Sequence, residues 1–303
     1  MARRPFYVSL GWTLRDYAKR VWDNSGEDNV LFLAGGVAFN IILAAVPFVL
    51  LAVWGATYLF GAFDTGLNST TTVVAAIDRL LPGHEETPDS PIHKLLADLF
   101  RANSSLRFYS AIGFVWFSTR LFGSLRTVLA NIFDIENERG IIEGKIFDVK
   151  ITVIASLLFV LSMAVSAYIT IATTRGAALL EARGLRTDVM GGVEYGVGRL
   201  IAFGILLLMF FALYKFLPIR RVRTKTAWVA SIFTGFMFEL ARSAFAYYAA
   251  TFNPGSLYTG TLTAIVVIVV WFYYAALIFI LGGEVGQVYE LRRTRKRQRE
   301  VFS

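Results

Sequence analysis

Cysteine is absent from the 303 residues of this chain, which excludes disulfide bonds and thiolate ligands. Charged residues make up only 17% of the chain. The two histidines, His84 and His93, have no His, Asp or Glu three or four positions further on. The HExxH, GxSxG and Walker A motifs, which mark zinc hydrolases, serine hydrolases and ATP-driven motors, are also missing. These absences predict a protein that is not an enzyme and has no metal or cofactor.

Hydrophobic residues are abundant instead, at 56% of the chain, and they include 26 Phe, 13 Tyr and 6 Trp. They gather into runs long enough to cross a bilayer, which takes about 20 mostly apolar residues. The six runs cover residues 30–60, 106–124, 149–171, 197–217, 227–250 and 262–283. We therefore predict an all-α, polytopic membrane protein with six transmembrane helices in one domain, 1–303.

The segments between the runs carry the topology signal. Twenty of the 30 Lys and Arg residues lie in, or within three residues of, the N-terminal segment, the loops after the second and fourth runs, and the tail 284–303, against seven in or beside the segments on the other side. The positive-inside rule then places both termini in the cytoplasm. Residues 12–24 have the apolar spacing of a helix lying in the membrane interface. The long segment 61–105 is the predicted extracytoplasmic loop, with short helices of its own.

Two of these segments are candidate contact surfaces. The basic tail is expected to meet anionic lipid head groups rather than nucleic acid, because juxtamembrane clusters of Lys and Arg commonly do so. The loop 61–105 is the surface on which a partner protein would dock. A protein built as a membrane scaffold would use both.

Two charges interrupt the fifth run. Glu239 and Arg242 are three residues apart, so they share one face of a helix. Each charge costs roughly 2.5–3.5 kcal/mol at the centre of a membrane helix, so they are expected inside the bundle or on a water-filled cavity. Two interpretations stay open: a substrate-binding or proton-coupling site, or an ion pair that fixes helix packing.

Other polar groups within the runs are candidates for the same site. Asn40 can bind substrate or bond to another helix, and Arg120 and Arg199 can bind substrate or reach the interface with their charged ends. Pro47 frees a backbone carbonyl within the first run. Gly282 and Gly283 would let another helix approach closely beside Glu284.

The second half of the chain resembles a known family. The stretch "LYKFLPIRRVRTKTAWVASIFTGFMFEL" and the following "AFAYYAATFNPGSLYTGTLTAIVVIVVWFYYAALIFILGGEVG" are similar to the YihY/virulence factor BrkB family of six-span inner-membrane proteins. The matching motif residues are Tyr214, Pro218, Glu239, Tyr258, Gly260, Trp271, Gly283 and Glu284. Thr259 separates a tyrosine and a glycine that are usually adjacent, and Ala44 stands where the family has a serine.

The resemblance implies a transporter-like protein of the bacterial inner membrane, with export of a lipid or lipid-linked molecule as the favoured activity. The departures from the motifs suggest a branch linked to export of lipid A precursors. The family has also carried the label ribonuclease BN, which the absence of a metal or acid–base signature here does not support. We expect a groove lined by the first, second and fifth spans to admit a phosphate-bearing head group. The alternatives are a scaffold that docks a partner and a proton-coupled transporter of small solutes.

Overall fold

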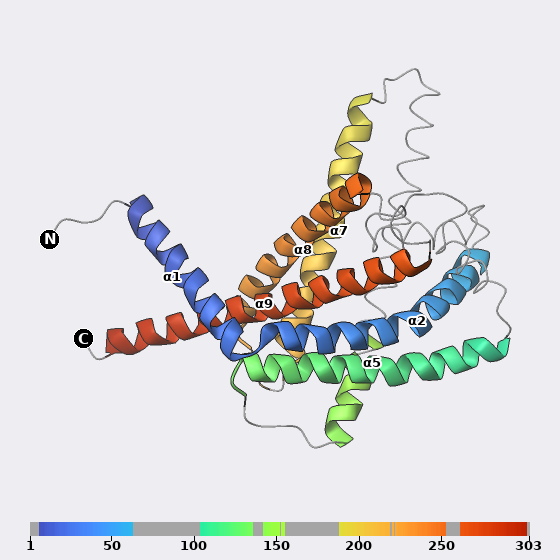
Figure 1. Ribbon diagram of the computed structural model, residues 1–303, viewed down its shortest axis with the longest axis horizontal. Helices are drawn as coiled ribbons and strands as arrows, with labels where there is room; N and C mark the ends of the chain where they lie inside the picture. Colours follow the sequence, from blue (N-terminus) through green and yellow to red (C-terminus); the bar gives the residue numbers. More distant parts are fainter. Residues whose placement is uncertain are drawn as a thin grey trace.

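The computed structural model describes residues 6–62, 104–135, 142–151, 153–154, 188–218, 220, 222–252 and 261–301. The described residues form helices and short connections, without a strand, which confirms the predicted all-α class. The principal helices are α1 (Phe6–Glu27), α2 (Val30–Ala62), α5 (Ser104–Ile132), α7 (Asp188–Phe216), α8 (Thr224–Phe252) and α9 (Thr261–Val301) (Figure 1). Residues 142–151 are also helical.

These helices extend beyond the apolar runs that predict them. The long apolar stretch of α2 covers the first run, and α9 continues from the sixth run through the basic tail to Val301. By length and composition, two helices in the described part of the chain can cross a membrane, over Thr224–Tyr248 and Ile265–Arg295. A third span is added if Arg15–Glu27 and Val30–Ala45, which meet at 68°, count together.

Two left-handed residues end helices where the chain turns. Asn29 has φ 51° between α1 and α2, and Asp134 has φ 49° after α5. Asn and Asp adopt this conformation more readily than other non-glycine residues. After Asp134, the Ile135 N–H donates to the Ala130 carbonyl at 2.9 Å, which satisfies a carbonyl that the end of the helix leaves without a partner.

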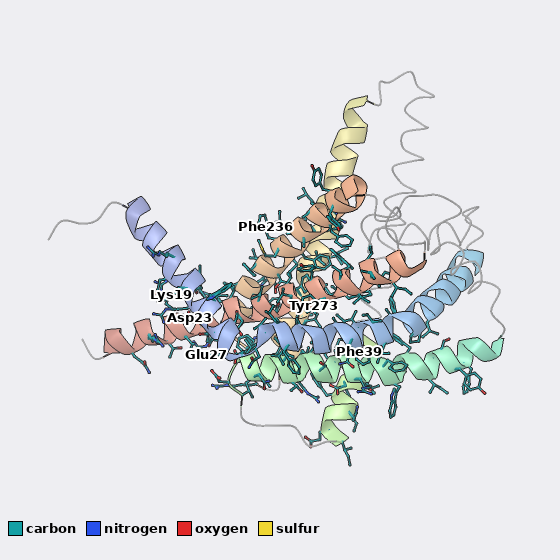
Figure 2. All side chains as sticks on the ribbon, viewed as in Figure 1. Lys19, Asp23, Glu27, Phe39, Phe236 and Tyr273 are labelled. Carbon is teal, nitrogen blue, oxygen red and sulfur yellow. The ribbon has the colours of Figure 1, made fainter. Side chains whose placement is uncertain are left out.

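Helix α9 lies at the centre of the fold (Figure 1). It packs against α2 and α8, and it joins two antiparallel pairs, α2 with α5 and α7 with α8. The α7–α8 pair leans away from the α2–α5 pair in the view of Figure 1. Many large apolar side chains face outward, among them Phe39 on α2 and Phe236 on α8 (Figure 2), as expected for helices surrounded by lipid.

The close helix approach expected at Gly282 and Gly283 is present. A Cβ atom at Gly282 would overlap the Thr234 hydroxyl on α8, and one at Gly283 would lie 3.1 Å from Ile132 Cδ1 on α5. Beside Gly282, the buried Tyr214 hydroxyl lies 2.7 Å from Thr234 Oγ1 and also donates to the Phe279 carbonyl. The Tyr214 ring stacks on Phe279 with centroids 4.8 Å apart. The absence of side chains at these glycines therefore brings α7, α8 and α9 together.

Several predictions fall outside the described residues. These are the third span beyond residue 154, nearly all of the loop 61–105, and the motif residues Tyr258 and Gly260. The expectations for them stay predictions.

Candidate functional site

The charged pair of the fifth run is an ion pair on α8. Arg242 Nη2 donates to Glu239 Oε1 at 2.8 Å, as their spacing of three residues predicts. The Glu239 side chain is 27% exposed and that of Arg242 is 36% exposed. The pair borders an outward stripe of exposed apolar residues on the same helix that includes Phe236 and Leu240. The two charges are therefore half-buried at the edge of an apolar surface.

Helix α7 packs against α8 on the N-terminal side of the pair. Phe211 stacks on Trp228 with centroids 4.6 Å apart, and a Cβ at Gly235 would meet Leu207 and Phe203. The contacting residues have decreasing numbers along α7 and increasing numbers along α8, so the two helices are antiparallel. If this pairing of α7 with α8 continues for one more helical turn, the α7 backbone near position 199 lies at the same level as the ion pair on α8. The side chain of Arg199 itself lies outside the described residues.

The remaining candidates lie on the other helix pair. Asn40 donates to the Gly36 carbonyl of its own helix at 2.9 Å, rather than to a neighbouring helix. Arg120 is exposed on α5, and Pro47 is buried in α2, near Gly113 of α5. Helix α5 packs on α2 and α9, whereas α8 packs on α7 and α9. Among the described side chains, neither Asn40 nor Arg120 contacts the Glu239–Arg242 pair. The groove expected between the first, second and fifth spans therefore remains a prediction.

Apart from Glu239, the described motif residues lie in the core. Trp271 is buried against Phe238 and Phe245, with centroids 5.4 and 5.3 Å away. Pro218 is buried just after the end of α7. Together with Tyr214 and Gly283, these residues fix the packing of the helices that meet at α9.

A second polar cluster lies where the α1–α2 turn and the end of α5 meet α9. The Asn24 amide donates to Gln287 Oε1 at 3.1 Å, and Gln287 Nε2 donates to Asp134 Oδ2 at 2.9 Å. Glu284 is fully buried, one turn before Gln287, and neither of its carboxyl oxygens has a hydrogen-bond partner among the described residues. Asp28 adds a further acidic group nearby. The family motif marks Glu284, whereas no local pattern in the sequence marks Asn24, Asp28, Asp134 or Gln287.

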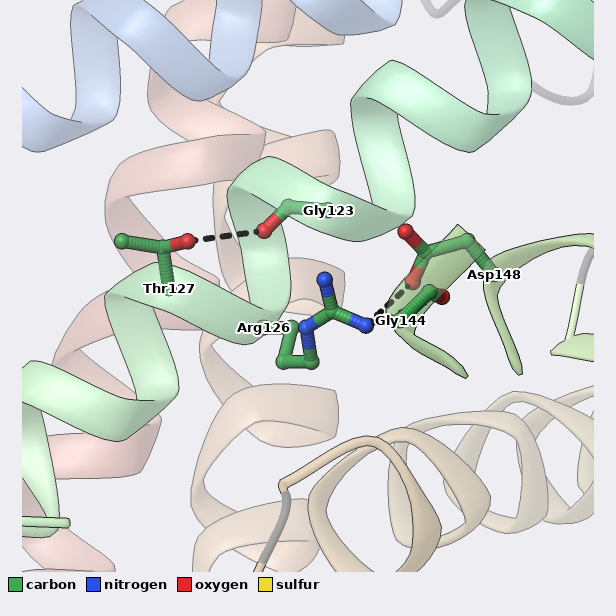
Figure 3. A network of polar contacts seen from close by, with 5 residues as sticks. All are labelled: Gly123, Arg126, Thr127, Gly144 and Asp148. Carbon is green, nitrogen blue, oxygen red and sulfur yellow. Dashed lines mark hydrogen bonds and ion pairs between the residues drawn. The ribbon is translucent and has the colours of Figure 1, made fainter. Parts of the chain in front are cut away.

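An ion pair that the sequence analysis also missed connects α5 to residues 142–151. Arg126 Nη1 donates to Asp148 Oδ1 at 2.9 Å and to the Gly144 carbonyl at 3.1 Å (Figure 3). The Asp148 side chain is only 2% exposed, and that of Arg126 is 18% exposed. Gly123 of α5 lies beside this pair, and a Cβ there would be 3.4 Å from Asp148 Oδ2.

The basic end of α9 is partly engaged by α1. Arg292 lies 3.5 Å from Asp16 Oδ2, and its guanidinium sits over the Tyr17 ring at 5.3 Å. Partial burial raises the pKa of the Tyr17 hydroxyl above its usual value, and the Arg292 charge opposes that rise. The exposed side chains of Arg295 and Gln298 continue beyond this contact. No group of three or more His, Asp or Glu side chains within the described ranges is arranged to hold a metal ion.

Comparison with known proteins identifies the family. A family model described as virulence factor BrkB matches residues 21–301. The chain belongs to this family. A UPF0761 membrane protein of Alteromonas mediterranea is 25% identical over 98% of the chain and 97% of its own length. One from Cronobacter sakazakii is 25% identical over 94% of the chain and 93% of its own length.

A further relative is the Bacillus subtilis protein YfkH, whose name describes it as ribonuclease-like, and which is 21% identical over 85% of the chain and 89% of its own length. No solved structure matches the chain. The membrane character of the relatives and the apolar helices of the structure agree that this is a membrane protein.

Proposed function

We propose that this protein exports a lipid or lipid-linked amphiphile with an anionic head group, such as a phospholipid or a lipid A precursor, across a bacterial inner membrane. It moves this substrate without cleaving it and has no ATPase of its own. The observation that carries the proposal is the half-exposed Glu239–Arg242 pair at the edge of an exposed apolar stripe within a membrane-crossing helix.

Arg242 is suited to the head group. A guanidinium has five N–H donors in a planar fork, and one of its nitrogens is engaged by Glu239. The described residues supply no other acceptor for Arg242, so the rest of the fork is available to phosphate oxygens. Charge-assisted bonds of this kind are about twice as strong as neutral ones. Glu239 holds the guanidinium in place.

The apolar stripe is suited to the acyl chains. Ile232, Phe236 and Leu240 are each more than half exposed and follow one another at intervals of four residues along α8. Acyl chains can therefore stay in the bilayer beside the helix while the head group moves along the charged edge. The protein then has to shelter the head group alone, because the chains never leave lipid.

The proposal also includes the orientation of the protein in the membrane and the lipids that its basic tail contacts. Both termini lie in the cytoplasm, and the exposed basic end of α9 contacts anionic head groups of the inner leaflet. Nucleic acid is not a partner on this proposal.

The test uses the full chain reconstituted into vesicles of phosphatidylethanolamine and phosphatidylglycerol that contain fluorescently labelled phosphatidylglycerol. A reductant that cannot cross the membrane reports how quickly inner-leaflet label reaches the outside. Loss of charge-assisted bonds worth about 1.5–3 kcal/mol predicts that Arg242→Gln slows translocation about tenfold or more. Glu239→Gln is expected to slow it less, because the amide oxygen still accepts from Arg242.

The matched control is Lys225→Gln, which removes one positive charge from an exposed position in the first turn of the same helix. This variant should translocate lipid at the wild-type rate. Equal rates for wild type, Arg242→Gln and Glu239→Gln, in vesicles that contain equal amounts of protein, would exclude the exporter. A scaffold that docks a partner would then be favoured, and deletion of 292–303 or replacement of 62–105 would abolish its function.

A further inference from the structure

The most unusual buried group outside the ion pair is Glu284 on α9. Its side chain has no exposed surface, and neither carboxyl oxygen has a hydrogen-bond partner among the described residues. It directly follows Gly283, whose backbone lies against Leu129 and Ile132 of α5. Native structures rarely leave a buried polar group unsatisfied, so such a group needs an explanation.

The groups that face Glu284 make an ionised carboxylate unfavourable there. Asp28 faces it from the turn between α1 and α2, and Asp134 faces it from the end of α5. Both are acidic, and Asn24 approaches it without the geometry of a hydrogen bond. One N–H of each nearby amide is directed to another acceptor, since Asn24 donates to Gln287 and Gln287 donates to Asp134.

Among the described residues of α8, no cation is paired with Glu284. Where α8 packs on this part of α9, it presents Thr226 and Ala230 to Gly286. Arg223, just before α8, is 3.3 Å from Glu290 and so is engaged by a different carboxylate. An uncompensated ion buried in this way costs several kcal/mol.

We propose that Glu284 is a proton-binding site, with the proton as its ligand, and that the bound proton holds α1 and the end of α5 against α9. The enclosed position admits a ligand no larger than a proton, and the described carboxylates do not form a metal site. A protonated carboxyl is neutral and becomes a donor, so it removes the repulsion and can bond to Asp28 or Asp134. The inference is independent of the substrate proposed above.

The α1–α2 turn is the element that would move. Asn29 adopts the left-handed conformation at a 68° bend, directly beside Asp28. When Glu284 loses its proton, three acidic groups repel one another at the junction, and we expect the bend at Asn29 to open outward against the contacts that hold α1 to α9. Low pH therefore favours α1 packed on α9, and high pH favours its release.

Two measurements on the full chain in vesicles test this inference without following lipid translocation. The first follows the infrared carbonyl band of protonated carboxylic acids as pH rises. The band of Glu284 should disappear with increasing pH, be lost altogether in Glu284→Gln, and be retained in the exposed control Glu143→Gln. Asp28→Asn removes one repelling charge, so the band should disappear at a lower pH in that variant.

The second measurement is the distance between spin labels attached to cysteines introduced at Lys19 on α1 and Arg293 on α9. The absence of native cysteine makes the labelling specific. The distance should lengthen with rising pH in wild type and stay short at every pH in Glu284→Gln.

A label distance that changes equally in both proteins would overturn the inference. So would a carbonyl band unaffected by Glu284→Gln. If Glu284→Gln does not fold, the inference is decided by the pH at which the carbonyl band disappears in Asp28→Asn. A band that disappears at the same pH in Asp28→Asn and wild type would count against the proton site. A failure of lipid translocation would leave both measurements unaffected, so the two proposals can fail separately.

Discussion

The packing of α9 against α8 predicts a graded response to alanine at three glycines. A Cβ at Gly282 would overlap the Thr234 hydroxyl and lie 2.5 Å from Tyr214 Oη. Neither group can move aside cheaply, because threonine is β-branched and the Tyr214 ring is held by its stack on Phe279. Gly282→Ala must therefore separate the helices or break both bonds of the tyrosine hydroxyl.

The magnitude follows from these contacts. Overpacking a tight core costs about 1–3 kcal/mol, and each lost buried hydrogen bond adds roughly 0.5–1.5 kcal/mol. We expect Gly282→Ala to lower the free energy of unfolding by about 3–5 kcal/mol. Gly283→Ala should cost less, since the flexible end of the Ile132 side chain lies 3.1 Å away and can adjust. Gly35→Ala has nothing within 4 Å and should be neutral, or stabilising by up to about 1 kcal/mol.

The assay is thermal unfolding of the full chain in detergent, followed by the fraction that remains monodisperse after heating. The double variant Gly282→Ala with Thr234→Ala removes the hydroxyl that clashes, so its cost should be smaller than the sum of the two single costs. Equal stability of Gly282→Ala and Gly35→Ala would refute the packing argument.

Two further predictions concern buried polar contacts. Tyr214→Phe keeps the stack on Phe279 and removes the hydroxyl, so it should lower the free energy of unfolding by about 1–3 kcal/mol in the same thermal assay. Asp148→Asn leaves Arg126 without its charged partner and should cost about 3 kcal/mol, whereas Asp16→Asn, in an exposed pair, should cost less than about 1 kcal/mol. Equal losses in Asp148→Asn and Asp16→Asn would contradict the burial argument.

Much of the fold follows from local patterns in the sequence. Apolar runs predict membrane helices because length and composition suffice for them, and α2 and α8 occupy the expected positions. The ion pair of Glu239 and Arg242 is equally local, since residues three apart on a helix are neighbours. The extension of α9 through the tail was not predicted, although Arg, Lys, Gln and Glu are all good helix formers.

Long-range polar contacts could not be predicted in this way. Arg126 and Asp148 are 22 positions apart, and Asn24 and Gln287 are 263 apart. Their pairing depends on how the helices pack, which periodicity along one helix does not specify. The isolation of Glu284 is also a property of the assembled helices, because it depends on which donors its neighbours have already used.

The continuous length of α9 couples the two sides of the membrane mechanically. Its 41 residues extend about 60 Å, roughly twice the thickness of the hydrocarbon layer. The part beyond Glu284 is an arm of about 25 Å, so a tilt of about 10° within the bilayer would sweep its far end by about 4 Å. If the protein has the proposed function and orientation, a small rearrangement around a substrate would be converted into a displacement at the cytoplasmic surface, where lipids or another protein could sense it.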